Sequence, residues 1–199
     1  MLHNVSSIFT STANIRDGLI LATSLICERL SLQQLMVVIP DEATLGKGNW
    51  VIGSHLTEEG IKGSQQVEQA PSPLYHLWDT LLIAEDSQSS FDRSEEVIDA
   101  LGEMKARGLA ACLPVKGPAG NMGVLLVGEK INQAAMDPLD LDFLGQFAER
   151  AGLFIENYLL STYLLIQLQE LMETRKKLEE PDCFKTDIIN ITSHELRTP

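Results

Sequence analysis

The stretch LAACLPVKGPAGNMGVLLVGEK, residues 109–130, decides the fold. It holds two apolar runs, 109–115 and 122–127, and each has the length and the Val and Leu content of a buried strand. The connector KGPAGN between them is built from the residues that β-hairpin turns favour. We therefore expect an antiparallel hairpin, with Pro114 at a bulge or a sheet edge, because proline cannot donate a ladder hydrogen bond.

Apolar runs upstream predict the remaining strands. Residues 35–40 and 50–56 flank a turn and form a second expected hairpin, and residues 81–84 form a further strand. Residues 57–73 are rich in Gly, Gln and Glu and lack periodicity, so they are interpreted as a long loop.

Helical spacing of apolar residues predicts helices over 14–30 and 92–107, and a long helix is expected from Pro138 onward. A short helix over 74–79, behind Pro73, is a further expectation. Together with the hairpins, this order predicts an α+β fold. An antiparallel sheet of five or six strands would carry flanking helices, and a long C-terminal coiled-coil helix would follow it. Candidate N-caps of the first helix are Ser11, Thr12 and Asn14.

Composition and charge exclude several classes of function. The 199 residues include 28 acidic and 15 basic side chains, for a net charge of −13. This excess disfavours a nucleic-acid binder or a polybasic membrane-surface protein, which need Lys and Arg. The cysteines, Cys27, Cys112 and Cys183, form no C-x-x-C pair, so we expect no metal site and a reducing, cytoplasmic setting. No apolar run is long enough for a membrane span, and no signal peptide is evident.

The C-terminal helix carries a heptad seam, with spacings of 4, 3, 4 and 3, at Leu164, Leu168, Leu171, Arg175 and Leu178. Such a stripe needs a partner, and a parallel copy from a second subunit, giving a homodimer, is the simplest one; the alternative is a helix folded back on its own domain. Pro181 predicts a kink or break between Lys177 and Asp182, either as a hinge or because a new helix begins there.

Three stretches resemble the GAF family. Residues 109–130 resemble its apolar-Pro strand, glycine turn and Gly-Val-Leu strand. DLDFLGQFAERAGLFIENYLL (140–160) resembles its closing helix, and SPLYHLWDTLLIAED (72–86) its central segment. The resemblance implies a PAS-like antiparallel sheet. The expected divisions of the chain are an N-terminal segment 1–11, a GAF sensor domain 12–155, a signalling helix 156–181 and a truncated phosphoacceptor helix 182–199.

The resemblance also implies a ligand pocket, which we expect on the sheet face beneath the 57–107 excursion. Residues 87–107 lack the Cys-His pair of bilin binders, and the animal-type cyclic-nucleotide signature Asn-Lys…Phe-Asp-Glu is absent. A free methionine sulfoxide reductase of GAF fold needs several pocket cysteines, and Cys112 alone is not enough. The ligand is therefore unknown. Candidate lining residues, each of which could instead be core, are Trp50, Tyr75, Trp78 and Cys112.

The most specific motif is FKTDIINITSHELRTP, residues 184–199, which closely resembles the phosphoacceptor box of sensor histidine kinases. On a helical wheel its apolar residues share one side, and His194 lies about 160° from Leu196, so the imidazole is free to face water. The resemblance implies that His194 is phosphorylated, that Glu195 is its acid/base helper and that Thr198 assists a phosphatase reaction. It also makes Pro199 a helix-kinking proline.

These residues predict the sensory and phosphoacceptor portion of a two-component sensor histidine kinase. The parent would phosphorylate His194 from ATP and Mg²⁺ held in a catalytic domain missing from this chain, and would pass the phosphate to an Asp of a response regulator. This chain alone has no nucleotide-binding motif, so we expect it neither to bind ATP nor to be an enzyme. The alternative is a GAF module that binds no ligand and serves only as a dimerisation and signal-relay spacer.

Overall fold

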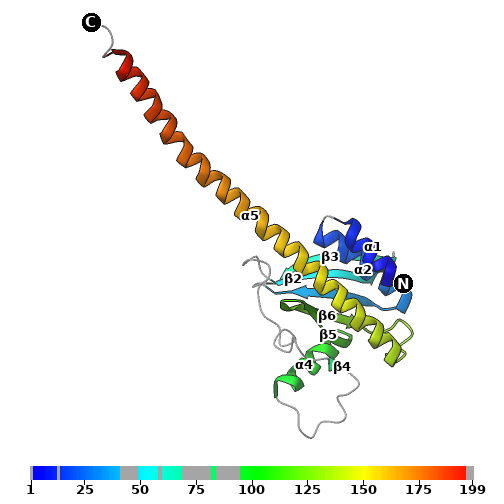
Figure 1. Ribbon diagram of the computed structural model, residues 1–199. Helices are drawn as coiled ribbons and strands as arrows, with labels where there is room; N and C mark the ends of the chain where they lie inside the picture. The colour runs from blue at the N-terminus through cyan, green and yellow to red at the C-terminus, as the bar shows by residue number, and fades with distance from the viewer. Residues whose placement is uncertain are drawn as a thin grey trace. The chain divides into compact units, whose positions relative to one another are not determined.

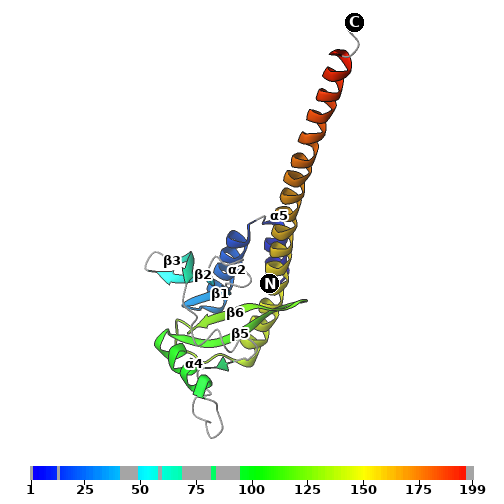
Figure 2. The ribbon, with the colours of Figure 1, turned by 90° about the vertical axis from the view of Figure 1, so that its left-hand side faces the viewer.

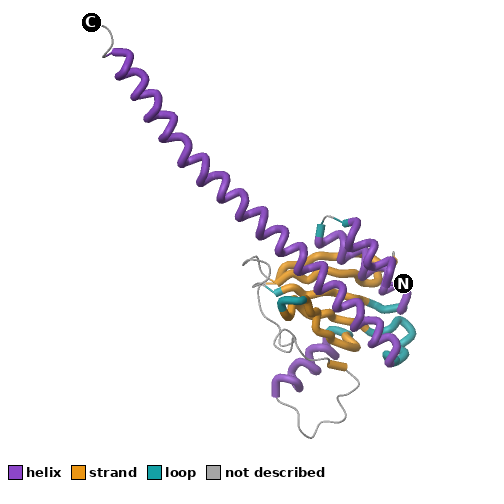
Figure 3. The backbone as a smooth tube through the Cα atoms, viewed as in Figure 1, coloured by secondary structure: helices purple, strands orange, loops and turns teal. Residues whose placement is uncertain are grey.

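The computed structural model describes residues 2–12, 14–40, 49–57, 60–68, 82–83 and 95–195, with side chains described up to residue 178 of the last helix. The chain divides into two compact units, Met1–Leu159 and Leu160–Pro199, and the last helix belongs to both. The elements, shown in Figures 1 and 3, are α1 (Leu2–Ser11), α2 (Ile15–Leu30), β1 (Gln34–Ile39), β2 (Asn49–Thr57), β3 (Gly60–Glu68), β4 (Leu82–Ile83), α4 (Glu95–Ala106), β5 (Leu109–Gly117), β6 (Gly120–Gly128) and α5 (Pro138–Glu195).

Within the described residues, the strands form one six-stranded antiparallel sheet in the order β3-β2-β1-β6-β5-β4. Both predicted hairpins are confirmed, as β1–β2 and β5–β6. β1 has a neighbour on each side, with Val37 opposite Ile52 of β2 and Leu125 of β6. Both faces of this central strand are buried, with Val37 in one apolar cluster and Val38 in the other, which explains its continuous apolar run.

Pro114 of β5 lies opposite Val124 of β6. The two residues of β4 pair with Cys112 and Ala111, so its described pairing stops before the proline. A register shift follows between Val115 and Lys116. The proline therefore lies where the β4 ladder ends and the strand becomes irregular, a position that tolerates the missing donor.

The loop predicted over residues 57–73 is wrong for its first part, because Gly60–Glu68 forms β3. This strand pairs with β2 from Thr57↔Gly60 to Asn49↔Glu68. Among the described strands it lies at the edge of the sheet, where backbone hydrogen bonds to β2 hold it, and its polar sequence gave no alternating signal. Glycine at position 63 has a steric explanation, because a Cβ atom there would lie 2.1 Å from Cγ2 of Ile20 on α2.

Helix α1 was not predicted either. Val5 is fully buried, and the Phe9 ring stacks on Phe154 of α5 at a centroid distance of 4.4 Å. Thr12 follows the helix, and its hydroxyl donates to the carbonyl oxygen of Ile8 at 2.7 Å. The apolar positions of this segment do recur at helical spacing, but its Ser, Thr and Asn residues are weak helix formers, so tertiary packing stabilises it.

The predicted helices have recognisable ends. Asn14 caps α2, with its side-chain oxygen accepting from the Arg16 amide at 3.0 Å. Gly108 follows α4 with φ +64°, a conformation that favours glycine. Helix α5 begins at Pro138, as predicted. Just before it, the Asp137 carboxylate accepts from the Asp140 amide at 2.8 Å, and Asp140 also forms an ion pair of 2.5 Å with Lys130.

Of the outcomes expected near Pro181, the break and the start of a new helix are wrong, because α5 is helical without interruption from Pro138 to Glu195. A kink or hinge there stays a prediction. A proline inside a helix removes one hydrogen bond and crowds the carbonyl of the preceding turn. Here the helix has many turns already formed on the N-terminal side of that position and more beyond it. One lost bond does not end a helix of this length.

The two faces of the sheet carry different layers (Figure 2). Helices α1 and α2 and the first part of α5 cover one face, and α4 lies on the other. The larger cluster includes Ile15, Leu19 and Ile26 of α2, Val37, Ile52 and Leu125 of the sheet, and Leu144, Phe147 and Ile155 of α5. The smaller one comprises Val38, Val51, Leu82, Ala100, Leu101, Met104, Leu109, Cys112, Val124 and Leu126.

Candidate functional sites

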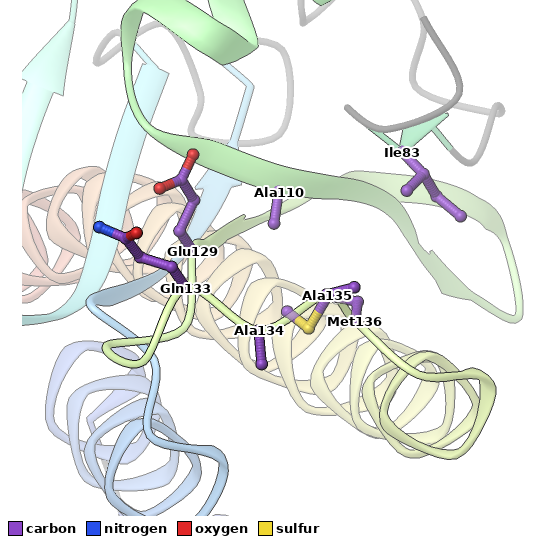
Figure 4. Close-up of a pocket in the computed structure, with 7 residues that line it drawn as sticks. All are labelled: Ile83, Ala110, Glu129, Gln133, Ala134, Ala135 and Met136. Carbon is purple, nitrogen blue, oxygen red and sulfur yellow. The ribbon is translucent and has the colours of Figure 1, made fainter. Parts of the chain in front are cut away.

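A pocket of about 250 Å³ lies where the segment after β6 passes β5 and β4 (Figure 4). The segment turns sharply because Gln133 has φ +55°, and the Gln133 amide donates to the Lys130 carbonyl oxygen at 2.9 Å. On the opposite wall, a register shift between Leu109 and Ala111 displaces Ala110 from the regular ladder. The lining residues are Ile83, Ala110, Glu129, Gln133, Ala134, Ala135 and Met136.

This pocket combines an apolar wall with two polar groups. Figure 4 shows the Glu129 and Gln133 side chains near one another, with Ile83 and Met136 farther along. Its volume is below the roughly 300–1,000 Å³ of pockets for drug-sized ligands. None of its residues was predicted from the sequence, since residues 129–136 contain no motif and the displaced Ala110 gives no sequence signal.

Cys112 lies on the sheet face that α4 covers and is 3% exposed. Ala100, Leu101 and Met104 of α4 belong to the same cluster. Burial raises the pKa of the Cys112 thiol to about 12, with a further contribution from the charge of Glu103 on α4. A neutral thiol among apolar side chains acts as a small core residue.

Trp50 lies on the opposite face. It packs against the cluster that contains Ile39, Ile52 and α2. The two described members of the expected pocket, Trp50 and Cys112, are therefore separated by the sheet, while Tyr75 and Trp78 lie outside the described residues.

The two buried thiols predict an alkaline dependence of stability. Burial raises the pKa of Cys27, like that of Cys112, from 9.0 to about 12. The folded state thus binds more protons than the unfolded state between these values. The contribution of the two protonated thiols to the free energy of unfolding is complete below about pH 9 and is lost as the pH rises towards 12. We expect the urea concentration at the midpoint of unfolding to be lower at pH 11 than at pH 8. The decrease should be smaller in the Cys27→Ala, Cys112→Ala double variant.

The same pKa shift leaves about one buried thiol in ten thousand ionised at pH 8. Cys27 and Cys112 should therefore resist a thiol reagent in the native protein and react once the chain is unfolded in urea. Rapid modification of either residue under native conditions would contradict the burial described above.

His194 and Glu195 lie in the last turn of helix α5. Thr198 and Pro199 lie outside the described residues, as do the side chains of residues 179–195. The structure therefore bears on this motif only through the backbone, which is helical up to Glu195. The expected roles of His194, Glu195 and Thr198 remain predictions.

In the second unit, α5 exposes a dense set of large apolar side chains. Leu164, Leu171 and Leu178 of the predicted seam are 60%, 68% and 69% exposed. This set is wider than the seam alone. Its described members are Leu160, Tyr163, Leu164, Leu165, Ile166, Leu168, Leu171, Met172 and Leu178. Exposed apolar surface of this extent is typical of an interaction site.

Membrane spans and metal clusters are both absent from the described residues. No helix among them combines the length and apolar character needed to cross a membrane. Within the same part of the chain, no three His, Cys, Asp or Glu side chains are grouped closely enough to hold a metal ion.

Comparison with solved structures finds similar folds at low sequence identity. A phycoerythrobilin-bound GAF domain from a cyanobacterial phytochrome has a TM-score of 0.56 at 12% identity, covering 81% of this chain and 95% of that one. A GAF domain from a Coxiella burnetii phosphoenolpyruvate-protein phosphotransferase has a TM-score of 0.55 at 11% identity, covering 81% and 94%. The GAF domain of a candidate sensor histidine kinase from Pseudomonas syringae pv. tomato has a TM-score of 0.50 at 16% identity, covering 83% and 90%. No family model and no curated protein matches the sequence. At these identities the similarity shows the fold alone.

Proposed function

We propose, from the GAF fold that this chain has, that it is the sensory and phosphoacceptor portion of a two-component sensor histidine kinase. The parent protein transfers the γ-phosphoryl group of ATP to His194 and then to an Asp of a response regulator. The setting is the cytoplasm, and the ATP and Mg²⁺ are held by a catalytic domain that is not part of these 199 residues.

The observation that carries this proposal is the sequence Ser-His-Glu-Leu-Arg-Thr-Pro at residues 193–199, preceded by Phe184, Lys185 and Asp187. It begins on the last turn of a helix that leads out of a GAF fold. The GAF domain of a candidate histidine kinase among the structural neighbours supports the same combination.

Each proposed role follows from the chemistry of the residue. The imidazole of His194 is the nucleophile that receives the phosphoryl group. The carboxylate of Glu195 accepts a proton from one ring nitrogen, which raises the nucleophilicity of the other. The hydroxyl of Thr198, four residues after the histidine, assists a phosphatase reaction. In that reaction the phosphate carried by the response regulator is hydrolysed.

The partner of the outgoing helix in this proposal is a second copy of the same chain. A heptad seam of Leu164, Leu168, Leu171 and Leu178 packs most simply against its own repeat in a parallel dimer. Arg175 interrupts the seam, which makes the contact modest.

The proposal is tested by incubating the parent protein with γ-labelled ATP and Mg²⁺. We expect acid-labile label on the parent, loss of that label to background in His194→Gln, and full label in His55→Gln, a control histidine on β2. This chain alone should remain unlabelled. Label that persists in His194→Gln would refute the assignment, and so would labelling of this chain alone by ATP.

A second candidate function is a ligand-free spacer that dimerises and relays signals. It is favoured by the small volume of the pocket at Glu129. A ligand that binds the native state raises the melting temperature. A thermal-shift panel of metabolites therefore separates the two candidates, since the ligand-gated sensor requires a compound that raises it.

A further inference from the structure

Helix α5 meets the tip of the β5–β6 hairpin at two positions one helical turn apart, Gly152 and Glu156. At Gly152 the helix backbone lies directly against the strand backbone. A Cβ atom there would stand 2.1 Å from the Lys116 carbonyl oxygen and 3.0 Å from the Gly117 nitrogen. No side chain fits between the two backbones, so glycine permits a contact that any other residue would hold apart.

At Glu156 the contact is a charged hydrogen bond. Both carboxylate oxygens lie within reach of the Ala119 amide of the hairpin turn, at 3.2 and 3.3 Å. Gly117 completes the fit, because a Cβ atom at that position would lie 2.2 Å from Oε2 of Glu156. We call Lys116, Gly117, Ala119, Gly152 and Glu156 the hairpin clamp.

The clamp lies at one end of a strand that passes the other candidate sites. β5 begins beside the pocket at Ala110, continues through Cys112 beneath α4, and reaches the clamp at Lys116. Its ladder shifts register between Val115 and Lys116, immediately before the contact. On the helix side, the first unit ends at Leu159, three residues after Glu156.

We propose that the hairpin clamp is the conformational device through which β5 acts on the last turn of α5 in the first unit. In the closed state, Glu156 and Gly152 fix this turn to the hairpin. In the open state the turn is released from the hairpin. The clamp itself rests on the contacts above, and its consequence for His194 rests on the proposed function.

Hydrogen exchange tests the clamp without any kinase. Glu156→Leu removes the carboxylate, and the exchange rate of the Ala119 amide should rise by about tenfold or more. Glu156→Gln keeps one acceptor oxygen and should stay close to the unmodified protein. Glu149→Leu, an exposed glutamate earlier on the same helix, is the matched control and should leave the Ala119 amide unchanged. Gly152→Ala opens the clamp by a separate, steric route and should also raise the rate.

Equal exchange of the Ala119 amide in Glu156→Leu and Glu149→Leu would overturn the clamp. The coupling is tested in the parent protein, where Glu156→Leu and Gly152→Ala should change the rate of His194 labelling and Glu156→Gln should not. If exchange responds while labelling does not, the proposed coupling is refuted although the contact exists. If the parent never labels His194, the proposed function fails, and the exchange measurements still decide the clamp.

Discussion

Replacing Phe147 by alanine is expected to lower the free energy of unfolding by about 3–5 kcal/mol. Phe147 is fully buried on the inner face of α5, within the cluster that joins this helix to the sheet. Its ring also faces Phe9 of α1, with centroids 6.3 Å apart. Truncation removes the ring from both contacts and leaves a cavity between a long helix and a central sheet, neither of which can move in to fill it.

This free energy is measured by thermal and urea denaturation, with unfolding of the first unit followed by fluorescence or circular dichroism. The matched control is Leu139→Ala on the same helix, where the side chain is 80% exposed and the change should stay within about 0.5 kcal/mol. A loss below about 1 kcal/mol for Phe147→Ala would mean that α5 does not pack on the sheet as described.

Replacing Leu171 by aspartate is expected to dissociate the proposed dimer. Leu171 lies in the middle of the heptad seam and is 68% exposed in the single chain. In a parallel dimer the two copies of this residue would face each other. Aspartate would then place two like charges in an apolar contact, which should weaken association by on the order of a hundredfold or more.

Sedimentation of this chain over a range of concentrations measures the result, with a dimer expected for the unmodified protein and a monomer for Leu171→Asp. Gln169→Asp provides the control, because residue 169 is exposed on the other side of the helix from the seam and its variant should remain dimeric. A monomer at every concentration in the unmodified chain would rule out the coiled-coil dimer, leaving the apolar face of α5 for another partner.

The sequence predicted those elements whose identity is fixed by local chemistry. Two apolar runs and a turn of Gly, Pro and Asn predict the β5–β6 hairpin. Helical spacing and the Asn14 cap predict α2. Strand β3 and helix α1 are held by contacts with distant residues. β3 depends on the β2 ladder and α1 on the Phe9–Phe154 stack. The polar sequence of β3 carries no alternating pattern, and in α1 the helical spacing is offset by residues that are weak helix formers.

The face of the sheet that a strand residue occupies is harder to predict from the sequence. Along a regular strand, alternate residues share a face, but β5 shifts register between Leu109 and Ala111. Counting from one end of β5 therefore cannot tell which face Cys112 occupies relative to Trp50 on β2. The same irregularity displaces Ala110 towards the pocket beside Glu129, which explains why sequence reasoning did not find that pocket.

Strand β3 at the end of the sheet order bears on how copies of this protein can associate. An edge strand offers a template on which a second chain could add its own strand and start aggregation. The sequence of β3, GIKGSQQVE, has two glycines, a lysine and a polar centre, all of which discourage such addition. Uncontrolled growth of the sheet at this edge is thus disfavoured.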